Sequence, residues 1–266
     1  MIKIKVLMFG WEFPPLHSGG LGTACYGLTK GLHNNGVEVN FVMPRIPTSI
    51  KGKYVNLVSA TPSNVSVIKI DSPLQGYMTQ EEYAITLNPF TDGEVSLYGK
   101  NLFDEVHRYA MLAGRLGREV EHDVIHAHDW MTYKAALAAK AISGKPLIVH
   151  VHATEFDRTG GNGLHQYVYD IEREGMHKAD QIIAVSQFTK DKIVDNYGVD
   201  AEKITVVHNA VEFNNHKFSK EDLGLSKNER VVLFLGRITL QKGPDYFVHT
   251  AKRVLDILPG VTFVMA

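Results

Sequence analysis

Short runs of Val, Ile and Leu alternate along the chain with segments in which apolar residues recur every three or four positions. The short runs are typical of buried strands, and the periodic segments are typical of amphipathic helices. The pattern predicts strands at residues 2–9, 37–43, 54–58, 65–70, 124–126, 146–152, 181–185, 204–207, 231–235 and 261–265. It predicts helices at residues 21–35, 101–121, 131–143, 164–178, 187–197 and 244–258. Strands that alternate with helices indicate an α/β fold with a parallel sheet.

A change in patterning near residues 209–227 divides the chain. The residues after the strand predicted at 204–207 are polar, and a new strand–helix–strand pattern begins at Val231. We therefore expect a Rossmann-like domain at residues 1–213 and the beginning of a second one at residues 214–266. Two strands and one helix bury too little surface to stand alone, so we expect this second domain to be incomplete. Residues 47–99 are expected to form short strands and loops at the rim of the first domain.

Composition excludes several classes of protein. Lys and Arg number 28 against 29 acidic residues, and the chain has no basic stripe, so we expect no nucleic-acid partner. Cys25 is the only cysteine, which excludes a disulfide scaffold and fits a reducing compartment. Lys3 and Lys5 interrupt the first apolar run, unlike a signal peptide, and no apolar stretch approaches transmembrane length. We therefore expect a cytoplasmic protein.

A glycine cluster follows the first predicted strand and leads into the first predicted helix. Gly19, Gly20 and Gly22 would place bare backbone N–H groups at the positive end of a helix dipole, which is a typical phosphate site. The cluster does not match the dinucleotide fingerprint, because it reads G-G-x-G and the second strand ends without a carboxylate. The alternative is a turn whose glycines serve only close packing.

Two histidine clusters end neighbouring predicted strands. His126 and His128 share one side of a strand by alternation, and Asp129 and Trp130 follow where a helix begins. The alternative for these last two is an ordinary helix N-cap and a core aromatic.

The second cluster, His150 and His152, ends the next run. Because carboxyl ends of parallel strands share one sheet edge, both clusters should converge beside the glycine loop. Such histidines could also hold the metal of a hydrolase, together with His126, His128 and Asp129. We expect no metal site, because His126 and His150 should lie within strands and pack in the core.

Two cations mark the second predicted domain. Arg237 leaves the end of a strand, and Lys242 lies just before Gly243 and Pro244, where a helix begins. Two cations and a helix N-terminus directed at the same point could bind a diphosphate. They would stabilise it most as negative charge grows on it during bond breaking. The alternative is a solvated pair of surface cations.

Taken in order, these motifs resemble those of the retaining glycosyltransferases of the GT-B fold, especially glycogen and starch synthases. The resemblance runs from Lys5 to the last residue. It is carried by residues 19–22, 126–130, the His152 segment, 172–180, 185–186, 208–211, 236–237 and 242–243.

The resemblance implies transfer of a glucosyl or related group, with retention, from a nucleoside-diphosphate sugar such as ADP- or UDP-glucose to a glucan or other carbohydrate acceptor. It implies that Gly19, Gly20 and Gly22 lie near the donor phosphates. It places His128, Asp129, Trp130 and His152 near the sugar and acceptor, with Asp129 and His152 among the catalytic residues. Arg237 and Lys242 would bind the departing diphosphate and take the place of a metal, so no cofactor is expected.

Two departures from the family pattern change what the resemblance implies. Glycogen synthases carry a lysine where this chain has His17, which moves the expected donor preference toward related transferases. The family's later nucleotide-binding loop and acidic motif do not occur in this sequence. We therefore expect the chain alone to be inactive, and a non-catalytic carbohydrate-binding module derived from such an enzyme is the alternative.

Overall fold

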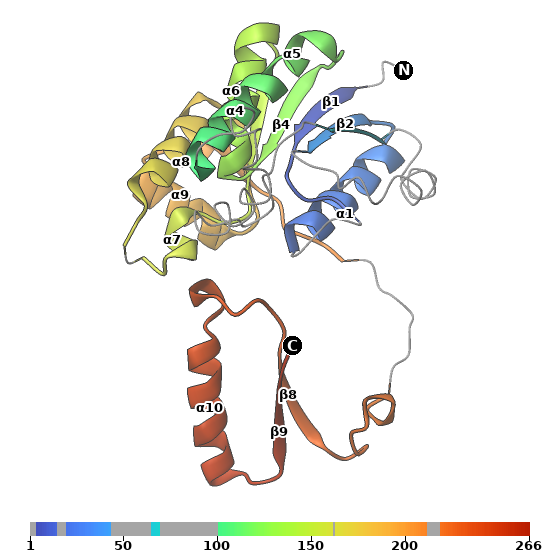
Figure 1. Ribbon diagram of the computed structural model, residues 1–266, viewed down its shortest axis with the longest axis vertical. Helices are drawn as coiled ribbons and strands as arrows, with labels where there is room; N and C mark the ends of the chain where they lie inside the picture. The colour runs from blue at the N-terminus through green and yellow to red at the C-terminus, as the bar shows by residue number, and fades with distance from the viewer. Residues whose placement is uncertain (1–3, 15–19, 44–64, 70–100, 162, 212–218) are drawn as a thin grey trace, which may run out of the picture. The chain divides into compact units, whose positions relative to one another are not determined.

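The computed structural model describes residues 4–14, 20–43, 65–69, 101–161, 163–211 and 219–266 (Figure 1). The chain divides into two compact units, one of residues 1–154 and 166–211, the other of residues 155–165 and 212–266. The boundary predicted between residues 213 and 214 lies outside the described residues, as do the strand predicted at 54–58 and most of the expected rim. Among the described helices, none has the length and apolar character needed to cross a membrane.

The larger unit is built on a parallel sheet of seven strands in the order β3-β2-β1-β4-β5-β6-β7. The strands are β1 (Lys5–Phe9), β2 (Glu38–Met43), β3 (Val65–Lys69), β4 (Val124–His128), β5 (Leu147–Val151), β6 (Gln181–Ala184) and β7 (Ile204–Val206). The central strands are buried and, apart from the histidines of β4 and β5, largely apolar, as expected of a parallel sheet that is covered on both faces. The predicted α/β fold with a parallel sheet is confirmed.

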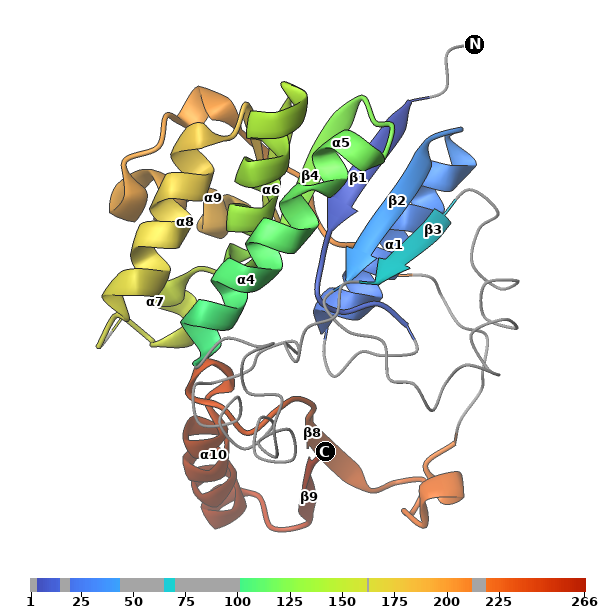
Figure 2. The same cartoon turned by 45° about the horizontal axis from the view of Figure 1, so that its top comes forward.

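Helices cover the two faces of this sheet (Figure 2). The helices are α1 (Gly20–Asn34), α4 (Leu102–Gly114), α5 (Leu116–Glu119), α6 (Trp130–Ser143), α8 (Gln166–Lys178) and α9 (Gln187–Tyr197). Helix α1 lies on one face, and α4, α6 and α8 pack side by side on the other. This division follows from right-handed crossovers, because the chain moves one way along the sheet from β1 to β2 and the opposite way from β4 to β7.

The helix predicted at residues 101–121 is interrupted at Arg115, between α4 and α5. Two glycines at the break press against the alanine-rich helix α6. A Cβ atom on Gly114 would lie 2.6 Å from the Cβ atom of Ala138, and one on Gly117 would lie 2.7 Å from the carbonyl oxygen of Ala139. Tertiary packing therefore overrides the helical periodicity here.

The smaller unit contains β8 (Arg230–Phe234), α10 (Pro244–Ile257) and β9 (Val261–Met265), together with the short helix α7 (Glu155–Arg158). The two strands pair in parallel, and the Phe247 ring packs 5.4 Å from that of Phe234 and 5.6 Å from that of Phe263. Leu233 remains 55% exposed and Leu235 79% exposed. The described part of this unit thus leaves much of its apolar surface uncovered.

Candidate active site

The site lies where the chain changes direction along the sheet. From β1 the chain moves to β2 on one side, whereas β4 lies against the other side of β1. In open α/β sheets, ligands bind beyond the carboxyl ends of the strands at such a point. The structure brings together there the five residues that the sequence predicts to converge from β4, β5 and the turns that follow them, namely His126, His128, Asp129, His150 and His152.

Asp129 occupies the N-cap position of α6 without acting as a side-chain cap. Its Oδ1 atom instead accepts the backbone N–H groups of His152, at 2.8 Å, and Ala153, at 3.4 Å. Its own N–H donates to the carbonyl oxygen of His150 at 3.1 Å. The buried carboxylate therefore anchors the turn that carries His152, and the alternative of an ordinary N-cap is wrong.

The backbone of Asp129 is strained. Its φ of 58° and ψ of 173° fall in a region that is essentially restricted to glycine, and it is the only non-glycine residue with positive φ among the described residues. Such a conformation costs on the order of 1–3 kcal/mol and concentrates at functional sites. The chain bears this cost at the residue that the motif places in the catalytic centre.

Trp130, the next residue, belongs to an aromatic cluster under the site. It is 7% exposed, and its ring lies 6.4 Å from those of Trp11 and Phe103. This packing agrees with the alternative of a core aromatic. Its predicted contact with an acceptor stays a prediction.

Four imidazole rings form a tight group on one face of β4 and β5. The centroids of neighbouring rings are 4.3–5.4 Å apart, and Nδ1 of His128 lies 3.0 Å from Nε2 of His152. His126 and His150 lie within strands and are buried, as predicted. We refer to His126, His128, His150 and His152 as the histidine cluster.

Burial keeps the histidine cluster uncharged. Desolvation, with a smaller contribution from neighbouring imidazoles, holds the pKa values of His126 and His128 well below the ordinary value. Burial lowers the pKa of His150 to about 2, with His152 contributing, and lowers that of His152 to about 4. All four rings are therefore neutral at physiological pH, which suits hydrogen bonding to an uncharged ligand or coordination of a metal.

These shifts predict that the protein loses stability in mild acid. In the unfolded chain the four histidines take up protons near pH 6.5. In the folded chain the pKa values of His126 and His128 are held well below this, and those of His150 and His152 are lowered to about 2 and about 4. Below pH 6.5 each histidine should reduce the free energy of unfolding by up to about 1.4 kcal/mol per pH unit. Urea unfolding in metal-free buffer between pH 7.5 and 5.5 measures this, and the slope should be smaller for His150→Gln. A urea midpoint that does not change with pH over this range would contradict the predicted loss of stability.

The glycine loop differs in part from the prediction. Gly19 lies outside the described residues, and Gly20 and Gly22 lie in the first turn of α1, at the site's end of β1. The N–H group of Gly22 is not bare, because it donates to Oε2 of Glu12 at 3.2 Å. Glu12 is 2% exposed, so a buried carboxylate already interacts with the positive end of this helix. Glu12 is not among the residues that the sequence predicts for the site, although an acidic residue between the two aromatic residues Trp11 and Phe13 is an indication of it.

Arg237 and Lys242 lie in the smaller unit, on either side of a short loop between β8 and α10. Lys242 is exposed and ends a 3-10 helix, Leu240–Lys242, and Arg237 is half-buried. A Cβ atom on Gly236 would lie 3.8 Å from Cγ of Lys242, so the lysine stem packs against the end of β8, where Arg237 leaves the strand. The structure thus brings the two predicted cations to one end of this unit.

Comparison with known proteins finds a family match that includes most of the chain. A family model described as Glycosyltransferase Family 4 matches residues 18–215. The chain is 26% identical over 264 residues to an uncharacterized glycosyltransferase of Methanocaldococcus jannaschii, covering 95% of this chain and 60% of that protein. It is 25% identical over 268 residues to a glycogen synthase of Mycobacterium tuberculosis, covering 99% and 61%. The chain thus spans about 60% of the length of the curated relatives it matches.

A solved structure supports the same fold. Anabaena Alr3699/HepE, in complex with UDP and glucose, superposes with a TM-score of 0.58 at 16% sequence identity. The match covers 98% of this chain and 69% of the Anabaena protein. At this identity the likeness shows the fold, and it agrees with the GT-B class that the sequence motifs predict.

Proposed function

The chain belongs to glycosyltransferase family 4, and from this premise we propose that the protein it forms part of transfers a sugar from a nucleoside-diphosphate sugar to a carbohydrate acceptor. The family match confirms the resemblance to a glycosyltransferase that was drawn from the motifs. The glycogen synthase among its relatives and the UDP and glucose bound to the Anabaena protein support a glucosyl donor. In our proposal the transfer retains the configuration at the anomeric carbon, and a glucan is one candidate acceptor.

The observation that carries the proposal is the strained, buried Asp129 and the turn it anchors. A polypeptide that needed only a helix N-cap at this position could use a relaxed backbone. Here the carboxylate holds the backbone of His152 and Ala153, with Oδ1 2.8 Å from the His152 nitrogen. Two groups of opposite character, an anionic carboxylate and a neutral imidazole, are thereby fixed at the carboxyl ends of β4 and β5. Such preorganised polar groups suit a reaction in which positive charge builds on a sugar ring.

The two cations complete the proposed chemistry. As the bond between the anomeric carbon and the diphosphate oxygen breaks, its electron pair goes to the diphosphate. Arg237 and Lys242 would neutralise that growing negative charge, which makes their effect stronger in the transition state than in the bound substrate. The amide groups of Gly20 and Gly22, with that of Gly19, are the proposed contacts for the donor phosphates on the larger unit, where a phosphate would compete with Glu12.

We also propose that donor binding needs more chain than these 266 residues. The curated relatives are longer by roughly the part that would complete a second domain, because the chain covers 60% and 61% of them. The uncovered apolar residues of β8, such as Leu233, are consistent with further strands and helices packing there. The proposed acceptor-side residues are all in the larger unit.

Incubation of the complete protein with labelled ADP- or UDP-glucose and a panel of saccharides tests this function. The proposal predicts that label moves from the donor to a saccharide and that nucleoside diphosphate is released. Saccharide binding by calorimetry, with no consumption of any donor, would instead support the non-catalytic module. The 266-residue chain alone should bind saccharide and show little or no transfer.

A further inference from the structure

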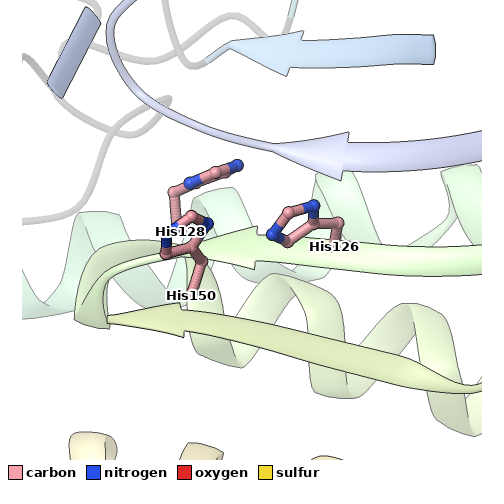
Figure 3. A group of neighbouring side chains, drawn as sticks. All are labelled: His126, His128 and His150. Atoms are coloured by element: carbon pink, nitrogen blue, oxygen red, sulfur yellow. The ribbon is translucent and has the colours of Figure 1, made fainter. Parts of the chain in front are cut away.

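Three imidazoles of the histidine cluster meet in a way that the proposed sugar transfer does not require. His126 and His128 project from the same face of β4, and His150 is the register partner of His128 on β5. Figure 3 shows His126 over the body of β4 and His128 at its carboxyl end, with His150 reaching toward His128 from β5. Each ring offers one nitrogen, and the three nitrogens all lie within 4.8 Å of one another.

Most of the nitrogens in this group have no hydrogen-bond partner among the described residues. These are Nε2 of His126, Nε2 of His128 and both ring nitrogens of His150. The three residues are 6%, 0% and 4% exposed, so bulk water does not solvate them freely. Because buried polar atoms are normally bonded, these nitrogens call for a partner other than the described residues, and a bound metal ion is one that fits their chemistry.

We propose that His126, His128 and His150 bind one divalent transition-metal ion, with zinc as the preferred metal. The donor set consists of imidazole nitrogens without a carboxylate, which suits zinc, copper, cobalt or nickel and disfavours magnesium and calcium. A set of three histidines with an open fourth position holds zinc in carbonic anhydrase. Two of the ligands come from one strand and the third from its neighbour, so the metal would tie the ends of β4 and β5 together.

The surroundings of His128 fit those of a metal ligand. Ligating histidines almost always bond a second group through their other nitrogen, and Nδ1 of His128 lies 3.0 Å from Nε2 of His152. With a metal on Nε2, the Nδ1 atom must carry the proton and donate it to His152. Metal binding would thereby fix the tautomers of both rings.

Coordination requires a modest adjustment of the rings. Metal–nitrogen bonds of 2.0–2.1 Å in a tetrahedral site place the nitrogens about 3.4 Å apart, whereas here they lie within 4.8 Å. Small rotations of the three side chains about their Cβ–Cγ bonds can shorten these distances. This metal would lie on the sheet of the larger unit and would not take over the role proposed for Arg237 and Lys242 at the diphosphate. Because His128 contacts His152, which the proposed transfer uses, the inference is tested by metal binding and not by activity.

Zinc binding to chelator-treated protein tests the proposal. We expect one zinc ion per chain by elemental analysis after dialysis. Competition with a chelator should show that His126→Gln and His150→Gln each lower the affinity for zinc. The loss should exceed the roughly 10–100-fold that is typical when a residue hydrogen-bonded to a metal ligand is replaced. The matched control is His122→Gln, because His122 is also buried but bonds Val120 and Ser143 outside the cluster. Its affinity for zinc should equal that of the natural protein.

Cobalt provides a readout that does not depend on the variants folding. Cobalt bound by three imidazoles in a tetrahedral site should give the natural protein intense visible absorption, which zinc then abolishes. Stoichiometric zinc binding that survives in both glutamine variants would overturn the proposal. So would the absence of bound zinc together with the pale spectrum of hydrated cobalt, a result that would indicate an ordered water between the imidazoles.

Discussion

Replacing Lys242 by Met is expected to lower the kcat of sugar transfer by about 10²–10³-fold in the complete protein, the effect of removing one preorganised charge-stabilising donor. Lys242 ends the 3-10 helix Leu240–Lys242, and its stem packs against Gly236, the residue before Arg237. In the proposed function both cations bind the diphosphate. Because the charge on the diphosphate grows as the bond breaks, kcat should fall more than the affinity for the donor. Arg237→Met should have an effect of similar size. Steady-state kinetics with the donor as the varied substrate measures both quantities.

The matched control is Lys252→Met. Lys252 is an exposed lysine of α10, so its replacement makes the same change of charge in the same unit. It should leave kcat unchanged. Equal activity of Lys242→Met and Lys252→Met would support the alternative of a solvated surface cation and would contradict the role assigned to Lys242.

The second large effect is expected for variants of Asp129, in which sugar transfer should fall much more than the free energy of unfolding. Asp129→Gly relieves backbone strain of about 1–3 kcal/mol, because glycine adopts this conformation freely. It also leaves the N–H groups of His152 and Ala153 without their acceptor, at a cost of about 1–3 kcal/mol for each group that stays buried. Because the relief of strain offsets part of this cost, the free energy of unfolding should fall by no more than a few kcal/mol, whereas transfer should fall at least about 100-fold because the turn carrying His152 loses its anchor.

Asp129→Ala is the companion variant. It removes the same carboxylate but keeps a Cβ atom in the strained conformation, so it should be less stable than Asp129→Gly by about 1–3 kcal/mol. Urea unfolding compares the two, and the transfer assay should find both strongly impaired. Equal stability of the two variants would contradict the strain, and normal transfer by Asp129→Gly would contradict the functional role.

The parallel sheet and the histidine cluster could be predicted because both depend on short-range periodicity. Alternation along β4 places His126 and His128 on one face, and strand ends share an edge in a parallel sheet. The same reasoning placed His150 and His152 beside them. These features needed only the order of apolar and polar residues.

Other features depend on contacts that residue spacing does not reveal. The hydrogen bond between Glu12 and the Gly22 amide joins two residues that are ten positions apart. Neither the period of a helix nor that of a strand relates these positions, so the sequence pattern does not indicate the contact. The break at Arg115 coincides with two glycines that are pressed against another helix. The positive φ of Asp129 is not readable from its residue type, because such a backbone normally indicates glycine. The orphaned imidazole nitrogens, too, emerge only once β4 and β5 are paired in register.

The linkage in the transfer product tests the account most directly. NMR of the saccharide formed by the complete protein from α-linked nucleoside-diphosphate glucose reports whether glucose was transferred and with which configuration. We predict an α-linked glucosyl residue on the acceptor. A β linkage would contradict the retaining reaction, and release of free glucose with an unmodified saccharide would contradict transfer itself.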